Sequence, residues 1–446
     1  MNIRIVSFIA FSIALTTHAK AGTVMTVRGP IDSAELGRTL EHEHILVYFI
    51  GAEETGYHRW DRGEVSQQVL PYLEQAKDLG FQSLIECTPA FLGRDPQLLK
   101  SLSETTRLHL VTNTGYYGAR ENKYIPEDIQ KLSADELAAR WIKEFENGIE
   151  DTGIKPGFIK IGVDRGDTLS PMHEKLVRAA CRAHLETGLT IACHTGPTQA
   201  IFQMVEILQE ECVSPEALIW VHATQADQES QLKAARLGLW VSIDNVNDTP
   251  NRIDFVSRAL VRLKNAGLQD RVLLSHDAGW YRPGEENGGK FRDYTAISSH
   301  LIPRIMRMGY NSTYVDKLLI DNPRRAFELG VHTSDEHTSA FIGSGLVINQ
   351  VTRNSISIGT QITKFPKDSS GAKLGVPGQV RLSYQSEIGH AGMTDWVSAS
   401  ADDNFTHDFS ISGLKEHTEY TLTAEARRNP TAPVTDTLSA SITTKR

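Results

Sequence analysis

The feature that most limits the fold of this sequence is a regular alternation of short apolar runs with longer segments of helical periodicity, from residue 39 to about residue 330. The apolar runs are nearly continuous until their last residues, as expected for strands buried on both faces. Such alternation indicates βαβ crossovers and a parallel sheet. We predict strands at residues 39–46, 83–89, 109–116, 156–164, 189–196, 218–224, 239–246 and 272–278.

Helix-boundary signals lie between these runs. Ser133 and Glu136 form a capping box, and Ser170-Pro171 begins a helix that Gly188 ends. Strands in this number, within about 290 residues, fit a (β/α)₈ barrel better than a doubly wound sheet, and no G-x-G-x-x-G follows the first strand. The predicted fold class is α/β, with a (β/α)₈ TIM barrel over residues 22–332.

The C-terminal part, residues 333–446, has a different pattern. Short alternating runs with turn residues between them predict an antiparallel β-sandwich of about 100 residues. Tyr420 in "LKEHTEY" has the position of a tyrosine corner, in which the hydroxyl bonds to upstream backbone. The segment resembles a fibronectin type III domain, although Gly359 and Thr360 stand near the place of that family's core tryptophan.

The N-terminal residues 1–21 have the form of a signal peptide. A basic start, an apolar stretch too short to span a bilayer and the cleavage site Ala19-Lys20-Ala21 predict a periplasmic or secreted protein. No later segment reaches the roughly 18 apolar residues of a membrane span. The net charge of −9, without long basic runs, argues against nucleic acid or an anionic membrane as partner. The four cysteines form no C-x-x-C pair, and we expect buried thiols.

Polar residues that can bind metal stand late in the predicted strands. His42 and His44 share one face of the first strand, because side chains at i and i+2 point the same way. The same alternation predicts that Glu41 and Glu43 face the helix layer. Barrel sites lie at the C-terminal ends of the strands. A single histidine in a strand is more often an ordinary polar residue, but the whole set predicts a metal site: His42, His44, Lys160, His194, His222 and Asp277.

The residue types point to divalent transition metals. Neutral imidazole and carboxylate suit Zn, Mn, Co or Fe, and cations offset the cost of burying them. Lys160 is the exception, because an ammonium repels metal ions. In the run "GFIKIGVD" this lysine is either kept neutral by desolvation or converted chemically into an anion.

The motifs "TLEHEH", "GFIKIGVD", "IACHTG", "WVHA" and "LLSHDAGW", in this order, resemble the phosphotriesterase-related family of the amidohydrolase superfamily. The resemblance covers about residues 23–330. It implies that His42, His44 and Asp277 hold the more buried of two metal ions, that His194 and His222 hold the other, and that Lys160, carboxylated by CO₂ to a carbamate, bridges them. It further implies attack by a metal-bridging hydroxide, with Asp277 as the general base and zinc as the first choice of metal.

Two departures concern the family's outer proton relay. Gln225 replaces the Asp of phosphotriester-cleaving members, and Asn245 replaces their relay His and the Arg of lactone-cleaving relatives. His276 could rebuild the relay or could be a structural residue facing the helices. Tyr117 matches the lactone-cleaving relatives, which favours lactones or other carboxylic esters over phosphoesters, with amides as a further option.

The long loop after the eighth strand supplies substrate-binding candidates, Trp280, Tyr281 and Arg282, although these residues could instead pack the loop onto the barrel. Cys193 is rejected as a nucleophile, because alternation points it away from His194. The predicted function is an exported binuclear metal hydrolase acting on a small-molecule ester or lactone. The alternative is a secreted binding protein without catalysis, attached to a surface, glycan or partner by its sandwich. A homodimer is left open.

Overall fold

The structure is a computed structural model of the chain. It describes residues 22–196, 199–334, 342, 346–362, 378–399, 405–427, 430, 434 and 436–446. The predicted signal peptide therefore lies outside the described residues, as do parts of the C-terminal region.

Every predicted strand of the α/β region is present, and these strands pair in parallel. They form two sheets, with strand orders β11-β10-β9-β8-β7-β6 and β12-β3-β4-β5. The run predicted at 109–116 is split into β5 and β6. The bounds are β3 Thr39–Leu46, β4 Ser83–Glu86, β5 His109–Val111, β6 Asn113–Thr114, β7 Phe158–Gly162, β8 Ile191–His194, β9 Leu218–Val221, β10 Trp240–Ile243, β11 Val272–Leu274 and β12 Gly279–Tyr281.

A backbone contact joins β11, at the edge of one sheet, to β3 of the other sheet. The N–H of Asp277, just after β11, donates to the carbonyl of His42 in β3 over 3.1 Å. The backbone N–H of His42 in turn donates to Ser275 Oγ at 3.0 Å. The first and last of the predicted strands are thus neighbours, and this contact brings the residues that follow β11 to the histidines of β3.

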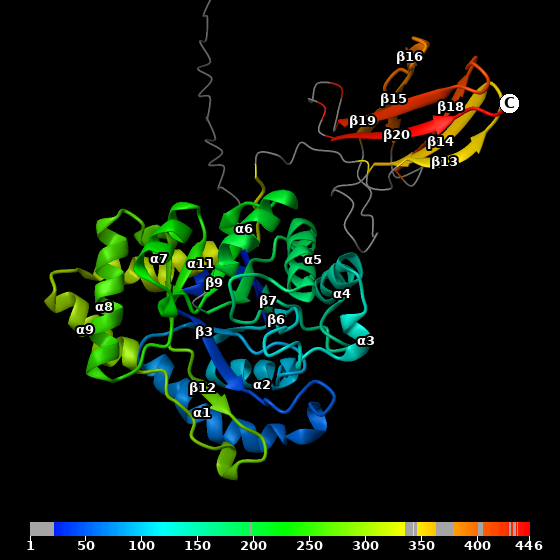
Figure 1. The fold of residues 1–446 in the computed structure, drawn as a ribbon. Coiled ribbons are helices and arrows are strands. Elements are labelled where there is room, and N and C mark those ends of the chain that lie inside the picture. Colours follow the sequence, from blue (N-terminus) through cyan, green and yellow to red (C-terminus); the bar gives the residue numbers. More distant parts are fainter. Residues whose placement is uncertain are drawn as a thin grey trace, which may run out of the picture.

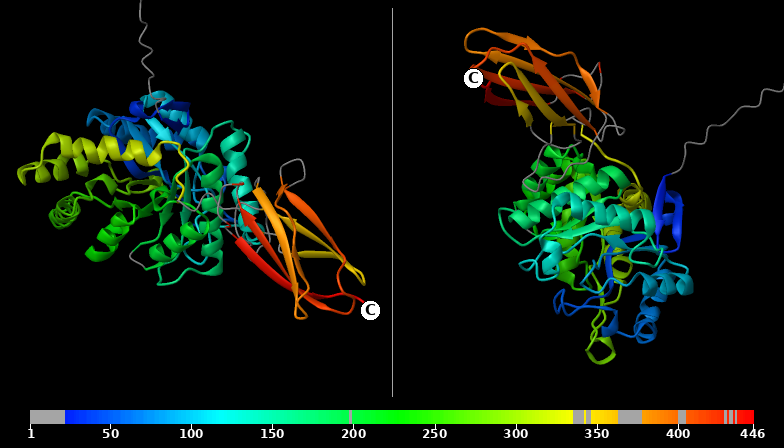
Figure 2. Two further views of the ribbon diagram at one scale, coloured as in Figure 1. Left: turned by 90° about the horizontal axis from the view of Figure 1, so that it is seen from above. Right: turned by 90° about the vertical axis from the view of Figure 1, so that its right-hand side faces the viewer.

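Helices surround the parallel strands in the views of Figures 1 and 2. The predicted capping box is confirmed at the start of α4, and α5 begins after the Ser170 cap and ends at Gly188, which adopts φ +72°. The helices are α1 Arg62–Asp78, α2 Pro96–Thr106, α3 Glu127–Gln130, α4 Ala134–Asn147, α5 Pro171–Thr187, α6 Ala200–Glu210, α7 Gln228–Arg236, α8 Pro250–Asn265, α9 Ile302–Arg307, α10 Ser312–Asp316 and α11 Asn322–Phe327. The α/β class is confirmed.

Alternate residues of the parallel strands pack into two apolar layers. Leu84, Ile159 and Cys193 belong to the layer that includes the helices. Ile85 and Phe158, their neighbours in sequence, belong to a separate inner cluster. An N-terminal hairpin that the sequence pattern did not predict, β1 Thr23–Thr26 and β2 Gly29–Asp32, contributes Val24 to that inner cluster.

Strand β3 departs from strict alternation, and one prediction fails for this reason. Its register against β4 shifts by one residue between Leu40, opposite Leu84, and Glu43, opposite Glu86. The extra residue of such a bulge changes the face of the side chains before it. Glu43 faces the helix layer as predicted. Its carboxylate contacts the ring of His276, whose Nε2 accepts the backbone N–H of Ile297. The prediction for Glu41 is wrong, because its carboxyl accepts a hydrogen bond from Ser242 in the interior.

The C-terminal region forms antiparallel strands with a hydrophobic core of their own, which includes Ile358, Leu382 and Tyr420. The sheets have orders β13-β14-β18 and β16-β15-β19-β20, with β17 also on β15. The Tyr420 hydroxyl accepts the backbone N–H of Lys415 at 2.8 Å, as a tyrosine corner requires. The strands are β13 Val347–Val351, β14 Ser355–Gln361, β15 Gly378–Ser386, β16 Ala391–Met393, β17 Val397–Ala399, β18 Thr406–Ser412, β19 Glu419–Arg427 and β20 Asp436–Thr443.

None of the helices in the described ranges combines the length and the hydropathy that crossing a membrane requires.

Candidate metal centre

The two histidines of β3 and the aspartate after β11 come together. His44 Nε2 lies 3.3 Å from Asp277 Oδ1, and His42 Nε2 lies 3.8 Å from the same oxygen. Each of these residues offers a ligand atom within 4.8 Å of the others. Three donors at this spacing, two of them imidazole nitrogens, suit a divalent transition metal.

A second group shares His42 and extends to β10. Asp244 Oδ2 lies 2.9 Å from His222 Nδ1 and 3.4 Å from His42 Nδ1. His42, His222 and Asp244 also place ligand atoms within 4.8 Å of one another. Asp244 is not among the metal ligands predicted from the sequence. Its signal was available, because it stands at the end of the seventh strand, level with the other polar residues.

His194 completes the cluster of imidazoles. Its ring centroid lies 4.5 Å from that of His222, and the rings meet edge to face. Tyr117 packs against the other side, with its ring centroid 4.9 Å from that of His194. The structure therefore places Tyr117, a substrate-binding candidate from the sequence, beside His194.

Lys160, in the middle of β7, is the buried amine of the site. Only 2% of it is exposed, and in the part of the chain that the structure describes its Nζ has no hydrogen-bond partner. A buried ammonium without partners costs several kcal/mol of free energy. Conversion of the amine into an anion that binds metal would remove that cost, so the residues present fit a metal centre better than an empty polar cavity.

Most of the histidines are held neutral. Burial, followed by the charge of Lys160, lowers the pKa of His42 to about 3. Burial is also the main cause that lowers the pKa values of His44 and His194 well below the usual range. For His222 burial acts in the same direction, but Asp244 outweighs it and raises the pKa of that imidazole. Neutral imidazole is the form that binds metal.

Hydrogen bonds outside the cluster orient these side chains. Thr88 Oγ1 lies 2.8 Å from His44 Nδ1, which leaves His44 Nε2 toward Asp277. Glu43 accepts from Ser275 Oγ, from the backbone and Nδ1 of His276, and from the N–H of Ala278, over 2.7–2.9 Å. The Glu43 carboxylate thereby fixes the chain on both sides of Asp277. Partners of this kind set the geometry and basicity of metal ligands.

The backbone just after three strands, β9, β10 and β11, is left-handed. His222 has φ +64° and Asp277 has φ +52°, and Asn245 after Asp244 has φ +58°. Non-glycine residues in this region cost about 1 kcal/mol or more each, and they persist where surrounding contacts hold them. The site is therefore built on local strain that hydrogen bonds such as those of Glu43 offset.

The carboxyl of Glu41 lies in the interior of the strands, next to this site. Burial raises its pKa to about 8, while the hydrogen bond from Ser242 lowers it. Ser242 Oγ also lies 3.2 Å from Asp244 Oδ2. A chain of polar contacts thus runs from Glu41 through Ser242 to Asp244. Simple alternation could not reveal it, because it depends on the bulge in β3.

The residues considered for an outer proton relay, Gln225 and His276, make contacts that do not form a proton pathway. Gln225 Oε1 accepts a hydrogen bond of 3.0 Å from Arg165 Nη2. His276 has Nδ1 against Glu43 and Nε2 against the N–H of Ile297, so both ring nitrogens are engaged away from the ligands. His276 is the structural residue that the sequence left as one of two options.

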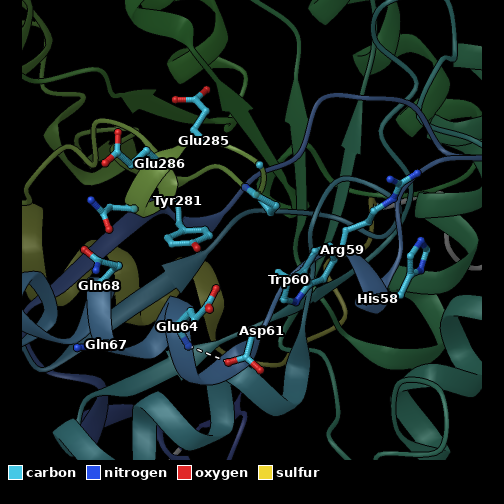
Figure 3. Close-up of a pocket in the computed structure, with 13 residues that line it drawn as sticks. His58, Arg59, Trp60, Asp61, Glu64, Gln67, Gln68, Tyr281, Glu285 and Glu286 are labelled. Carbon is cyan, nitrogen blue, oxygen red and sulfur yellow. Dashed lines mark hydrogen bonds between the residues drawn. The ribbon is translucent and has the colours of Figure 1, made fainter.

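The three loop residues after β11 are placed in different surroundings. The Trp280 ring lies 5.7 Å from that of His44. Tyr281 instead faces a separate cavity of about 660 Å³ between the first turns of α1 and the loop after β12, and none of the six predicted ligands lines it (Figure 3). Arg282 Nη1 lies 3.6 Å from Glu285 in its own loop.

The cysteines behave as expected from the sequence, since all four are buried thiols. Cys193 lies in the apolar layer that includes the helices, and burial raises the pKa of its thiol to about 12. A protonated thiol facing away from His194 is no nucleophile for this site.

Comparisons with known proteins agree with this geometry. Residues 22–327 match the profile of the Phosphotriesterase family. A phosphotriesterase homology protein of Escherichia coli (strain K12) is 30% identical over 66% of this chain and 98% of its own length. N-acetyltaurine hydrolase of Homo sapiens is 25% identical over 68% of this chain and 97% of its own. A solved structure of a mutant organophosphorus hydrolase from Deinococcus radiodurans superposes with a TM-score of 0.61 at 25% identity, over 69% of this chain and 98% of that one.

Proposed function

Because the chain belongs to the phosphotriesterase family, we propose that it is a binuclear metal-dependent hydrolase whose substrate is a lactone or another small carboxylic ester. The observation that carries this proposal is the convergence of His42, His44 and Asp277, from opposite ends of the α/β region, on one point. Chemistry with metals needs such a donor set, and the buried Nδ1 of His42 has no hydrogen-bond partner among the described residues.

His42, His44 and Asp277 would hold one ion, and His194 and His222 the second. Lys160, as a carbamate formed with CO₂, would be the ligand common to both. Zinc is the first choice, and the same donors accept Mn, Co or Fe. Two such ions, when bound, acidify a water molecule and polarise the carbonyl or phosphoryl oxygen of the substrate.

The residues of the chain have separate tasks in this reaction. Asp277 Oδ2 would take the proton of the attacking water, and 15% exposure of the Asp277 side chain gives it access to the substrate side. Asp244 would hold the His222 ring, which it contacts through Nδ1. Tyr117, beside His194 and 8% exposed, would border the reacting group. Burial raises the pKa of the Tyr117 hydroxyl, so it would act as a neutral donor.

The ester preference is supported by Tyr117 and by Gln225, which replaces the relay Asp of phosphotriester-cleaving members, whereas Asn245 matches neither group of relatives. The related proteins carry names that refer to an N-acetyl compound and to organophosphorus compounds. Amides and phosphoesters are therefore the alternatives to esters. A non-catalytic binding protein is the competing class, favoured only by the altered relay.

The proposal extends to the whole chain. The parallel strands would close as a (β/α)₈ barrel, since β11 and β3 are joined through Asp277 and His42. The C-terminal strands would form a fibronectin type III-like domain that attaches the enzyme to a surface, glycan or partner. Residues 1–21 would direct export to the periplasm or beyond.

The test is metal analysis of the full chain followed by a hydrolysis screen with aryl acetates, lactones, aryl phosphotriesters and N-acetyl amines. We expect two metal equivalents and fastest turnover of a lactone or aryl ester. His42→Ala should lose metal and turnover together, whereas His58→Ala, in the separate cavity, is the matched control. A chain that binds no metal, or that hydrolyses nothing when loaded, would leave the binding-protein alternative.

A further inference from the structure

A second cavity, of about 830 Å³, adjoins the candidate metal centre. It shares His194 and Tyr117 with that centre, and its other walls include Arg120, Arg165 and Asp164. A substrate held at the metal ligands would extend into this space. The charges along it therefore bear on which substrate fits.

Arg165 spans three segments at the rim of this cavity. It follows β7, and its guanidinium donates through Nη2 to Gln225, which ends the short helix after β9. The same side chain lies beside Gly196 after β8, where an added Cβ would be 3.7 Å from Arg165 Nε. The bond to Gln225 uses one of the five N–H donors of the Arg165 guanidinium. Among the described residues, Arg165 forms no ion pair.

Arg120 is the second guanidinium of the cavity. Its Cζ lies 5.2 Å from the centroid of the Phe49 ring, which holds the side chain by a cation–π contact. Within the ranges that the structure covers, Arg120 also has no recorded ion pair. Its positive charge acts on the site, since it lowers the pKa of Tyr117, against the larger raising effect of burial.

The acidic residues of the cavity do not cancel both cations. The Asp164 carboxylate accepts the backbone N–H groups of Arg120 and Glu121, and lies 3.7 Å from His173 Nε2. It is thus turned to backbone and to His173. Glu121 is the remaining acidic group in the wall and is exposed, as Arg120 and Arg165 are, so the wall carries two guanidinium groups against this one carboxylate.

We propose that the substrate carries an anionic group, such as a carboxylate or sulfonate, remote from the bond that is cleaved, and that Arg165 and Arg120 bind it. Arginine forks match planar or tetrahedral oxyanions. Gln225 acquires a role in this way: at the place where relatives have a relay Asp, it is a positioning residue that holds Arg165 toward the cavity. The inference rests on the proposed hydrolase function.

The test uses the metal-loaded full chain and three 4-nitrophenyl esters that differ only at the far end of the acyl chain: carboxylate, methyl ester and trimethylammonium. We expect kcat/KM at least tenfold higher for the carboxylate than for the methyl ester, and Arg165→Gln should lower this ratio about tenfold through KM. Gln225→Ala should lower it in the same direction, again through KM. Arg236→Gln, on the exposed face of α7, is the control and should keep the ratio.

A second readout does not need turnover. Butane-1-sulfonate, a poor metal ligand, should inhibit competitively and bind the unmodified chain in calorimetry, and Arg165→Gln should weaken that binding about tenfold. Glu121→Gln should strengthen it. A preference for the methyl ester or the trimethylammonium ester, with sulfonate binding unchanged in Arg165→Gln, overturns this inference and leaves the hydrolase standing. Failure to hydrolyse all three esters and the wider substrate panel would instead count against the proposed function.

Discussion

Asp244 holds His222 at two points, because its carboxylate accepts the His222 backbone N–H at 2.7 Å and lies 2.9 Å from Nδ1 of the ring. Burial alone would raise the pKa of Asp244, but His222 reverses this and places it well below the usual range. Asp244 is therefore an anion at every pH at which the protein would work.

Replacement of Asp244 by Asn should weaken metal binding about tenfold to a hundredfold, because the outer partner of a ligand histidine sets its orientation and basicity. Competition with a chromogenic chelator measures this affinity. Asp248→Asn, an exposed change a few residues away, is the control. Equal affinities of Asp244→Asn and the unmodified chain would contradict the assigned role.

Lys160→Ala should lose bound metal and activity together, since Nζ is buried without a partner in the described chain. Short carboxylic acids such as acetate should restore part of both, because a carboxylate can replace the carbamate oxygens in the space left by the side chain. Elemental analysis and turnover with increasing acetate measure this rescue. Lys143→Ala, on the exposed side of α4, should change neither quantity. Full activity of Lys160→Ala without acetate would rule out the bridging role.

Glu41→Gln should change how stability depends on pH in the metal-free protein. The folded pKa of Glu41 is raised from 4.5 to about 8. A raised carboxyl pKa contributes stability that is fully present below pH 4.5 and is lost as pH rises through about 8. The free energy of unfolding of Glu41→Gln relative to the unmodified chain should therefore increase by about 1.4 kcal/mol per pH unit over this window. Urea denaturation at pH 5 and pH 8 measures it, and a difference independent of pH would refute the assignment.

Tyr420→Phe should destabilise the C-terminal strands by about 1–3 kcal/mol, because the Lys415 N–H and His390 Nδ1 both lose the hydroxyl, each at 2.8 Å. Thermal unfolding followed by tyrosine-sensitive spectroscopy would report this change. Tyr384→Phe, whose ring centroid lies 6.0 Å from that of Tyr420, is the control. Equal effects of the two changes would mean that the hydrogen bonds of the Tyr420 hydroxyl do not account for the loss.

Much of this architecture was predictable from periodicity, and the limits have physical causes. Strand β3 was predicted to the residue, and His42, His44 and Asp277 meet as their strand positions required. Apolar runs report burial on both faces, which only parallel strands with helices around them satisfy. The role of Asp244 was missed because its partners lie on other strands, and sequence spacing does not show which strand ends touch.

The hairpin β1–β2 and the strand β12 were not predicted, because each is too short for its alternation to stand out. The hydrogen bond from Arg165 to Gln225 was also not predicted, because the two residues are 60 positions apart in the sequence. Gln225 was recognisable as a departure from the family, but its new partner lies on a different loop.

The one-residue shift in β3 bears on how the length of this segment could change during evolution. Leu40 and Glu43 keep the outward direction on either side of the shift, so Glu41 is the surplus residue of the strand. A chain lacking Glu41 would return to regular alternation with both histidines still turned inward. Loss of Glu43, only two residues later, would turn His44 away and break the ligand set. Deletion of the codon for Glu41 is thus expected to keep the ligand set, whereas deletion of the codon for Glu43 is expected to break it.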